Sequence, residues 1–74
     1  MQTDGTTNSV AILVNGERTR TPACTLAALV ADRGFAENQV ATALNGEFVA
    51  RSARAATLLR DGDKVEIVAP RQGG

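Results

Sequence analysis

The sequence predicts an α+β domain in which β-hairpins form one sheet and a single helix packs against it. Two Asn-Gly pairs, Asn15-Gly16 and Asn45-Gly46, each lie between two short strand-like segments. Asn-Gly favours the two positive φ angles of a type I′ turn, which is the strongest short hairpin signal. A segment with helical apolar spacing lies between the pairs, and 74 residues leave room for only one domain.

The first hairpin follows a polar start. Residues 1–9 offer little to bury and are predicted to be a flexible N-terminal tail. Val10–Val14 is short and β-branched, as expected of a strand. Glu17–Thr21 would be the return strand, polar and charged like a protected sheet edge, and Pro22 ends it.

One helix is predicted over residues 26–33. Its apolar residues recur at the spacing of a helix face: Leu26, Leu29 and Val30. Thr25 is a suitable N-cap because its hydroxyl can accept from a free N–H of the first turn. Gly34 suits the C′ position, and Phe35 can pack back on the last turn as in a Schellman motif.

The second hairpin pairs residues 40–44 with residues 47–51 around Asn45-Gly46. Residues 52–60 form a connection in which Leu58 and Leu59 are the only large apolar side chains. We expect at least one of these leucines to close the open end of the core.

The last strand follows a turn at Asp61-Gly62-Asp63. Residues 64–69 alternate polar and apolar, which predicts that Val65, Ile67 and Ala69 face inward. Pro70 stops the strand.

The predicted order of strand, strand, helix, strand, strand, strand is that of a β-grasp, or ubiquitin-like, domain over residues 10–70. Its first and last strands pair in the centre of a mixed sheet of about five strands. The helix covers one face of this sheet and the other face is free. On that free face we expect Leu13 and Val68, on neighbouring central strands, to form a small apolar patch that docks a partner.

Composition excludes several functions. Eight basic residues balance eight acidic ones, and Trp and Tyr are absent, so nucleic-acid binding is not expected. The lack of His removes the usual general base and the commonest metal ligand, so we expect neither catalytic nor metal-binding residues. The polar start and the absence of a long apolar run predict a cytoplasmic protein that does not bind membranes.

Few side chains are candidates for chemistry. Asp61 and Asp63 are interpreted as turn residues in preference to cation ligands. Arg51 and Arg54 are interpreted as solvated loop charges that help a partner dock, in preference to phosphate ligands. Cys24 could carry a persulfide, but a lone Cys without a neighbouring cation is more often a small apolar filler.

The strongest candidate is the C-terminus. Gly73 and Gly74 have no Cβ, so the segment 71–74, a predicted flexible tail, can thread a narrow channel in a partner. Arg71, Gln72 and Gly73 would occupy that channel and the Gly74 carboxylate would enter the partner's active site. The four residues beyond Pro70 reach about 13–14 Å when extended.

Several motifs together resemble the ThiS family of sulfur carriers. These motifs are Val14-Asn15-Gly16-Glu17, Ala43-Leu44-Asn45-Gly46-Glu47-Phe48-Val49-Ala50-Arg51, Leu59-Arg60-Asp61-Gly62-Asp63-Lys64-Val65-Glu66-Ile67-Val68 and Gln72-Gly73-Gly74. The Gln-Gly-Gly end and the Asn-Gly-Glu hairpins favour ThiS over the related small subunit of molybdopterin synthase.

The resemblance implies a carrier that is not itself an enzyme and binds no cofactor. An E1-like, ThiF-type adenylyltransferase would use ATP and magnesium to adenylate Gly74. Sulfur, which comes from a cysteine desulfurase in many systems, would then give a thiocarboxylate for a ThiG-type thiazole synthase. The alternatives are the molybdopterin synthase subunit, a carrier for cysteine or siderophore synthesis, a conjugated modifier and a simple adaptor.

Overall fold

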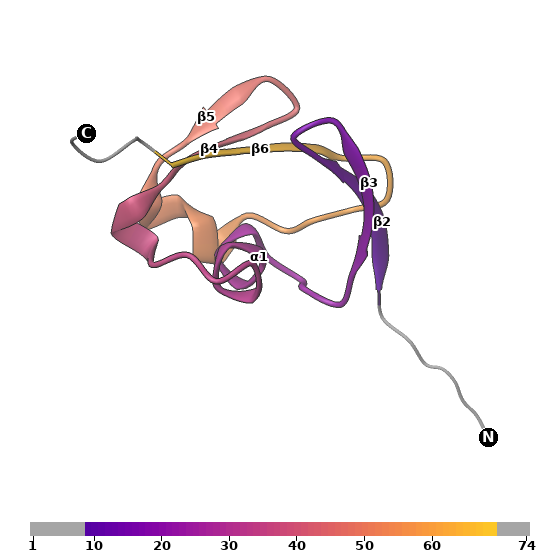
Figure 1. Cartoon of the computed structure of the whole chain (residues 1–74), viewed down its shortest axis with the longest axis horizontal. Coiled ribbons are helices and arrows are strands. Elements are labelled where there is room, and N and C mark those ends of the chain that lie inside the picture. The colour runs from indigo at the N-terminus through magenta and orange to yellow at the C-terminus, as the bar shows by residue number, and fades with distance from the viewer. Residues whose placement is uncertain (1–8, 70–74) are drawn as a thin grey trace.

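The computed structural model describes residues 9–69, whose main elements form one sheet with a helix across it (Figure 1). The elements are β2 (Val10–Val14), β3 (Glu17–Thr21), α1 (Leu26–Asp32), η1 (Glu37–Gln39), β4 (Ala41–Leu44), β5 (Glu47–Val49), η2 (Arg51–Ala56) and β6 (Lys64–Val68). No helix in residues 9–69 is long and apolar enough to cross a membrane.

The sheet is mixed and has five strands in the order β3-β2-β6-β4-β5. Both hairpins are antiparallel, and β4 pairs antiparallel with β6. The pairing of β2 with β6 is parallel. The last strand therefore lies in the centre beside the first, and the predicted mixed sheet with one main helix is confirmed.

Both Asn-Gly pairs form the predicted turns. The φ angles are 52° at Asn15 and 84° at Gly16, and the second turn repeats them at 51° and 87°. The Asn15 side chain also bonds β6: Nδ2 donates to the Ile67 carbonyl at 3.1 Å, and Oδ1 accepts from the Ile67 N–H at 2.9 Å. Asn45 Oδ1 accepts from the Lys64 N–H at 2.9 Å. Asn15 and Asn45 therefore each form a turn and also hydrogen-bond to the backbone of β6.

The helix caps are those predicted. Thr25 Oγ1 accepts a hydrogen bond from Ala28 N at 3.1 Å, which satisfies one free donor of the first turn. Gly34 has a φ of 88°, and the Phe35 N–H donates to the Val30 carbonyl at 3.2 Å. That bond is the long-range bond of a Schellman motif, and α1 ends one residue before the predicted boundary.

The core lies between the sheet and α1. Leu59 is 6% exposed and closes the core, whereas Leu58 is 60% exposed. Val65 and Ile67 face inward as predicted. The prediction for Ala69 is wrong, because β6 ends at Val68 and Ala69 is exposed beyond it.

Arg54 contradicts its predicted role as a solvated charge, because it is only 3% exposed. Its guanidinium donates through Nε to Thr42 Oγ1 at 2.9 Å, through Nη1 to the Glu37 carbonyl at 2.8 Å, and through Nη2 to the Val40 carbonyl at 2.7 Å. These acceptors lie between the first residue of η1 and the second residue of β4, so Arg54 joins both elements to η2. Arg51 is exposed, as predicted, but it begins η2 and is not part of a strand.

Candidate functional site

The predicted sulfur-carrying residue, Gly74, and the predicted channel segment of Arg71, Gln72 and Gly73 lie outside the described residues. So do Pro70 and residues 1–8 of the N-terminal tail that is predicted over residues 1–9. The structure does show what precedes the C-terminal segment. β6 pairs with a strand on each side, and Asn15 and Asn45 fasten it further. The strand that precedes the C-terminal segment is therefore held on both sides within the sheet.

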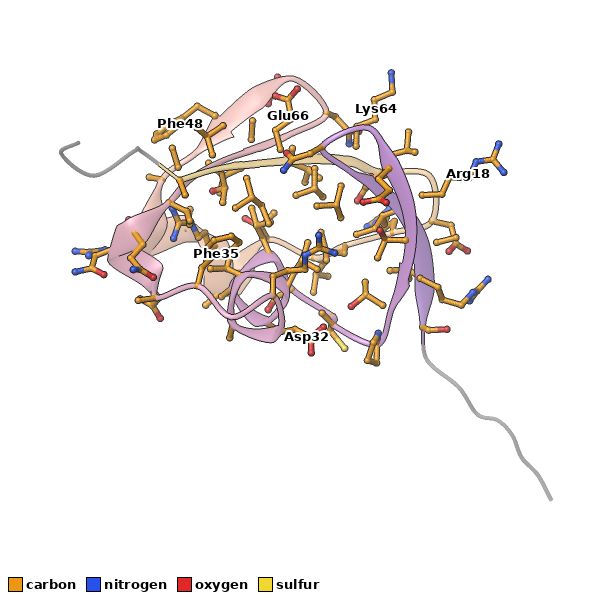
Figure 2. The ribbon with its side chains drawn as sticks, in the orientation of Figure 1. Arg18, Asp32, Phe35, Phe48, Lys64 and Glu66 are labelled. Atoms are coloured by element: carbon orange, nitrogen blue, oxygen red, sulfur yellow. The ribbon has the colours of Figure 1, made fainter. Side chains whose placement is uncertain are left out.

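The sheet face opposite α1 presents alternate residues of every strand. Figure 2 shows Phe48, Glu66 and Lys64 on this outer face, with Phe35 and Asp32 on the helix side. Phe48 is paired with Ala43, a neighbour of the buried Thr42, so the hairpin register places Phe48 on the outer face. Phe48 is 72% exposed, which is unusual for a large aromatic side chain.

Four residues make up an apolar patch at one end of the outer face: Ala41, Ala43, Phe48 and Val68. Ala41 pairs with Val68, and Ala43 pairs with Phe48 on its other side. Val68 is 60% exposed and ends β6. The apolar patch therefore lies beside the point where the chain continues towards Gly74.

The predicted pairing of Leu13 with Val68 in one patch is wrong. Leu13 is half-buried and pairs with Lys64, four residues before Val68 on β6. Four residues of strand span about 13 Å, so the two side chains share a face but not a contact. Sequence reasoning missed Phe48, although the fixed register of a two-residue Asn-Gly hairpin could have assigned it to the outer face.

Cys24 is exposed, so its interpretation as a buried filler is wrong. Its neighbour Ala23 takes the buried place, at 8% exposure. Asp61 and Asp63 are turn residues, as predicted: their carboxylates accept from the backbone N–H of Ala11 and Arg60, both at 2.8 Å. Residues 9–69 contain no group of three or more His, Cys, Asp and Glu side chains that could hold a metal ion.

The described part of the chain thus offers an exposed sheet face with an apolar patch, and a central strand, β6, that leads towards the C-terminus. The model of the ThiS family matches residues 12–74, a range that includes the terminal glycines. No curated protein matches the chain.

Two solved structures of a thiamine biosynthesis protein from Geobacter metallireducens are similar. The crystal structure, of a ThiS protein, has 30% identity and a TM-score of 0.73, and the match covers 88% of this chain and 100% of that one. The solution structure has 30% identity and a TM-score of 0.74, with 88% of each chain covered. Because the family model spans nearly the whole chain and both structures share its fold, the chain belongs to the ThiS family.

Proposed function

We propose that the chain carries sulfur as a thiocarboxylate on Gly74 and delivers it to thiazole synthesis in the thiamine pathway. Membership of the ThiS family supports the sulfur-carrier role. The observation that carries the proposal is that the family match extends through the Gly73-Gly74 end, which four residues separate from the end of β6 at Val68. The similar Geobacter protein, which is a thiamine biosynthesis protein, supports the choice of pathway.

The proposed chemistry begins with activation, because an ionised carboxylate resists nucleophilic attack. A Gly74 oxygen attacks the α-phosphorus of ATP on a ThiF-type adenylyltransferase, pyrophosphate leaves, and an acyl-adenylate forms. A hydrosulfide ion then attacks the carbonyl carbon, AMP leaves with the electrons of the broken C–O bond, and the proton of the resulting thioacid is lost to solvent. The resulting thiocarboxylate sulfur attacks an electrophile on a ThiG-type thiazole synthase.

The partners supply the catalytic groups in this proposal. Residues 9–69 hold no His, and their single Cys is far along the chain from the terminus. The adenylyltransferase would likewise bind the ATP and the magnesium, so the carrier needs no cofactor of its own. This division of labour explains how a chain of 74 residues can take part in a multistep reaction.

The apolar patch is the proposed contact with the adenylyltransferase. It is close to the start of the C-terminal segment, and its exposed aromatic side chain is typical of binding hot spots. Docking there would bring the tail to the active site while the body of the carrier stays outside. The patch is small, as expected of a carrier that must also leave its partner.

Replacing Phe48 with Asp is expected to raise the Kd for the adenylyltransferase about tenfold or more, because a charge would be desolvated in an apolar contact. Leu58→Asp is the matched control, since Leu58 is 60% exposed but bridges to Thr25 at the start of α1. Leu13→Asp should have a smaller effect than Phe48→Asp. Calorimetric titration measures all three variants, and equal Kd values for Phe48→Asp and Leu58→Asp would exclude the patch.

Partner capture tests the pathway. The carrier, immobilised through its N-terminus, should retain the adenylyltransferase and thiazole synthase. Retention of the large subunit of molybdopterin synthase in place of thiazole synthase would transfer the proposal to that pathway. A ladder of lysine conjugates would indicate a modifier instead.

A further inference from the structure

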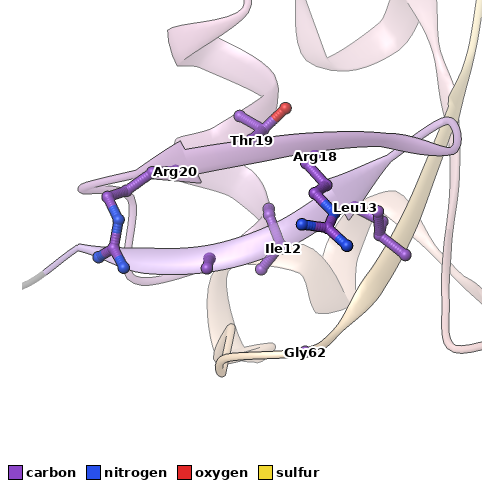
Figure 3. Close-up of a pocket in the computed structure, with 7 residues that line it drawn as sticks. Ile12, Leu13, Arg18, Thr19, Arg20 and Gly62 are labelled. Atoms are coloured by element: carbon purple, nitrogen blue, oxygen red, sulfur yellow. The ribbon is translucent and has the colours of Figure 1, made fainter.

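A hollow of about 430 Å³ lies on the outer face at the opposite end from the apolar patch (Figure 3). Its floor is formed by Ala11 and Leu13 of β2, and Gly62 lies at its margin. Figure 3 shows Arg18 and Arg20 of β3 reaching over β2 on the same side of the sheet. The hollow therefore combines an apolar floor with a cationic wall.

The strand register explains this arrangement. Arg18 pairs with Leu13 and Arg20 pairs with Ala11, so both arginines stand beside the floor. On the other side Leu13 pairs with Lys64, which places a third cation next to the same leucine. Leu13 thus lies between two cations in one row across three strands.

The side chains of Arg18 and Arg20 make few hydrogen bonds within residues 9–69. Arg18 is exposed and makes no side-chain hydrogen bond there, and Arg20 donates only to Ser9, at 2.8 Å to Oγ and 3.4 Å to the carbonyl. Two carboxylates lie nearby. Asp61 accepts a hydrogen bond from the Ala11 N–H, and Glu66 follows Lys64 by two residues on the same face of β6. Three basic side chains, Arg18, Arg20 and Lys64, therefore stand against these two acidic ones, which leaves this part of the face with one formal positive charge.

We propose that this hollow receives an acidic segment of the adenylyltransferase while the apolar patch contacts the same enzyme. The inference rests on the proposed function. Arg18 and Arg20 are two residues apart on one side of a strand, about 7 Å, which matches carboxylates at alternate positions of an extended peptide. Leu13 and Ala11 provide apolar contact between the two charges.

An acidic protein segment fits this site better than a nucleic acid. The chain has no net charge, whereas nucleic-acid binding relies on an excess of basic residues. Neither of its phenylalanines lines the hollow, so the hollow offers no aromatic surface on which bases can stack. The hollow and the apolar patch occupy the two ends of one exposed sheet face. One partner surface can cover both, and two separated contacts would fix the direction in which the tail points into the active site.

The test compares two variants with the same change in net charge. Arg18→Gln/Arg20→Gln removes two positive charges from the wall, and Arg33→Glu changes the charge equally at the C-cap of α1, on the other side of the sheet. Stopped-flow binding to the adenylyltransferase should show kon reduced about tenfold in the double variant at low ionic strength, with a weaker salt dependence. Arg33→Glu should stay close to the wild type. Circular dichroism should show both variants folded, because the replaced side chains are exposed.

Each other outcome has a distinct meaning. Equal kon values for the double variant and Arg33→Glu would overturn the acidic-segment inference and leave the proposed function intact. A single-stranded oligonucleotide that binds the wild type and not the double variant would also overturn it, in favour of nucleic acid. Failure of the wild type to bind the adenylyltransferase would overturn the proposed function and this inference with it.

Discussion

Adding one alanine after Gly74 is expected to abolish activation by the adenylyltransferase. The acyl group that reacts would then belong to the added residue, and the carboxylate would be displaced from the position that the partner's channel sets. The last two residues of the chain are glycines, so the added Cβ would also place side-chain bulk where the native end has none. The measurement is ATP–pyrophosphate exchange, which reports the adenylation step alone.

The matched control adds the same alanine before Met1, and its exchange rate should equal that of the wild type. Gly73→Val tests the steric argument separately, because a β-branched side chain widens the tail and restricts its backbone. It should lower the exchange rate at least about tenfold without changing the melting temperature, since Gly73 lies five residues beyond the end of β6 at Val68. Normal exchange in the extended chain would mean that the C-terminal carboxylate is not the group that reacts.

Replacing Arg54 with Leu is expected to lower the free energy of unfolding by about 3 kcal/mol. The guanidinium satisfies Thr42 Oγ1 and the carbonyls of Glu37 and Val40, and leucine leaves all three without this donor. A buried polar group without a partner costs about 1–3 kcal/mol. A domain of this size has a stability near the low end of about 5–15 kcal/mol, so most of it would be lost.

Urea denaturation measures this difference. Arg51→Leu is the control, because Arg51 lies in the same helix, η2, but is exposed. Its free energy of unfolding should change by less than about 0.5 kcal/mol. Equal losses in the two variants would show that the three hydrogen bonds of Arg54 do not hold η1, β4 and η2 together.

The sequence predicts the fold of this chain well because its signals are local. An Asn-Gly pair specifies a turn by its own backbone preferences, and the two-residue turn then sets the register of the hairpin. Thr25 and Gly34 cap a helix through groups within one turn of themselves. These features depend on neighbouring residues, so they can be recognised without knowledge of the tertiary structure.

Two of the errors concern contacts between residues that are distant in the sequence. Arg54 satisfies acceptors up to 17 residues away, and no local pattern distinguishes it from the exposed Arg51. Leu13 and Val68 lie on the predicted face, but the parallel register of β2 and β6 separates them. That register is fixed by core packing and by the Asn15–Ile67 hydrogen bonds. Both join residues that are far apart in the sequence, so no local turn motif reveals them.

The most direct test of the sulfur-carrier account is the intact mass of the chain after incubation with ATP, magnesium, the adenylyltransferase and a sulfur source. The account predicts that one oxygen is replaced by one sulfur and that fragmentation places the sulfur on Gly74. Cys24→Ser should gain sulfur equally, because Cys24 is not the carrier in this mechanism. An unchanged mass with active partners, or an added sulfur that maps to Cys24, would contradict the account.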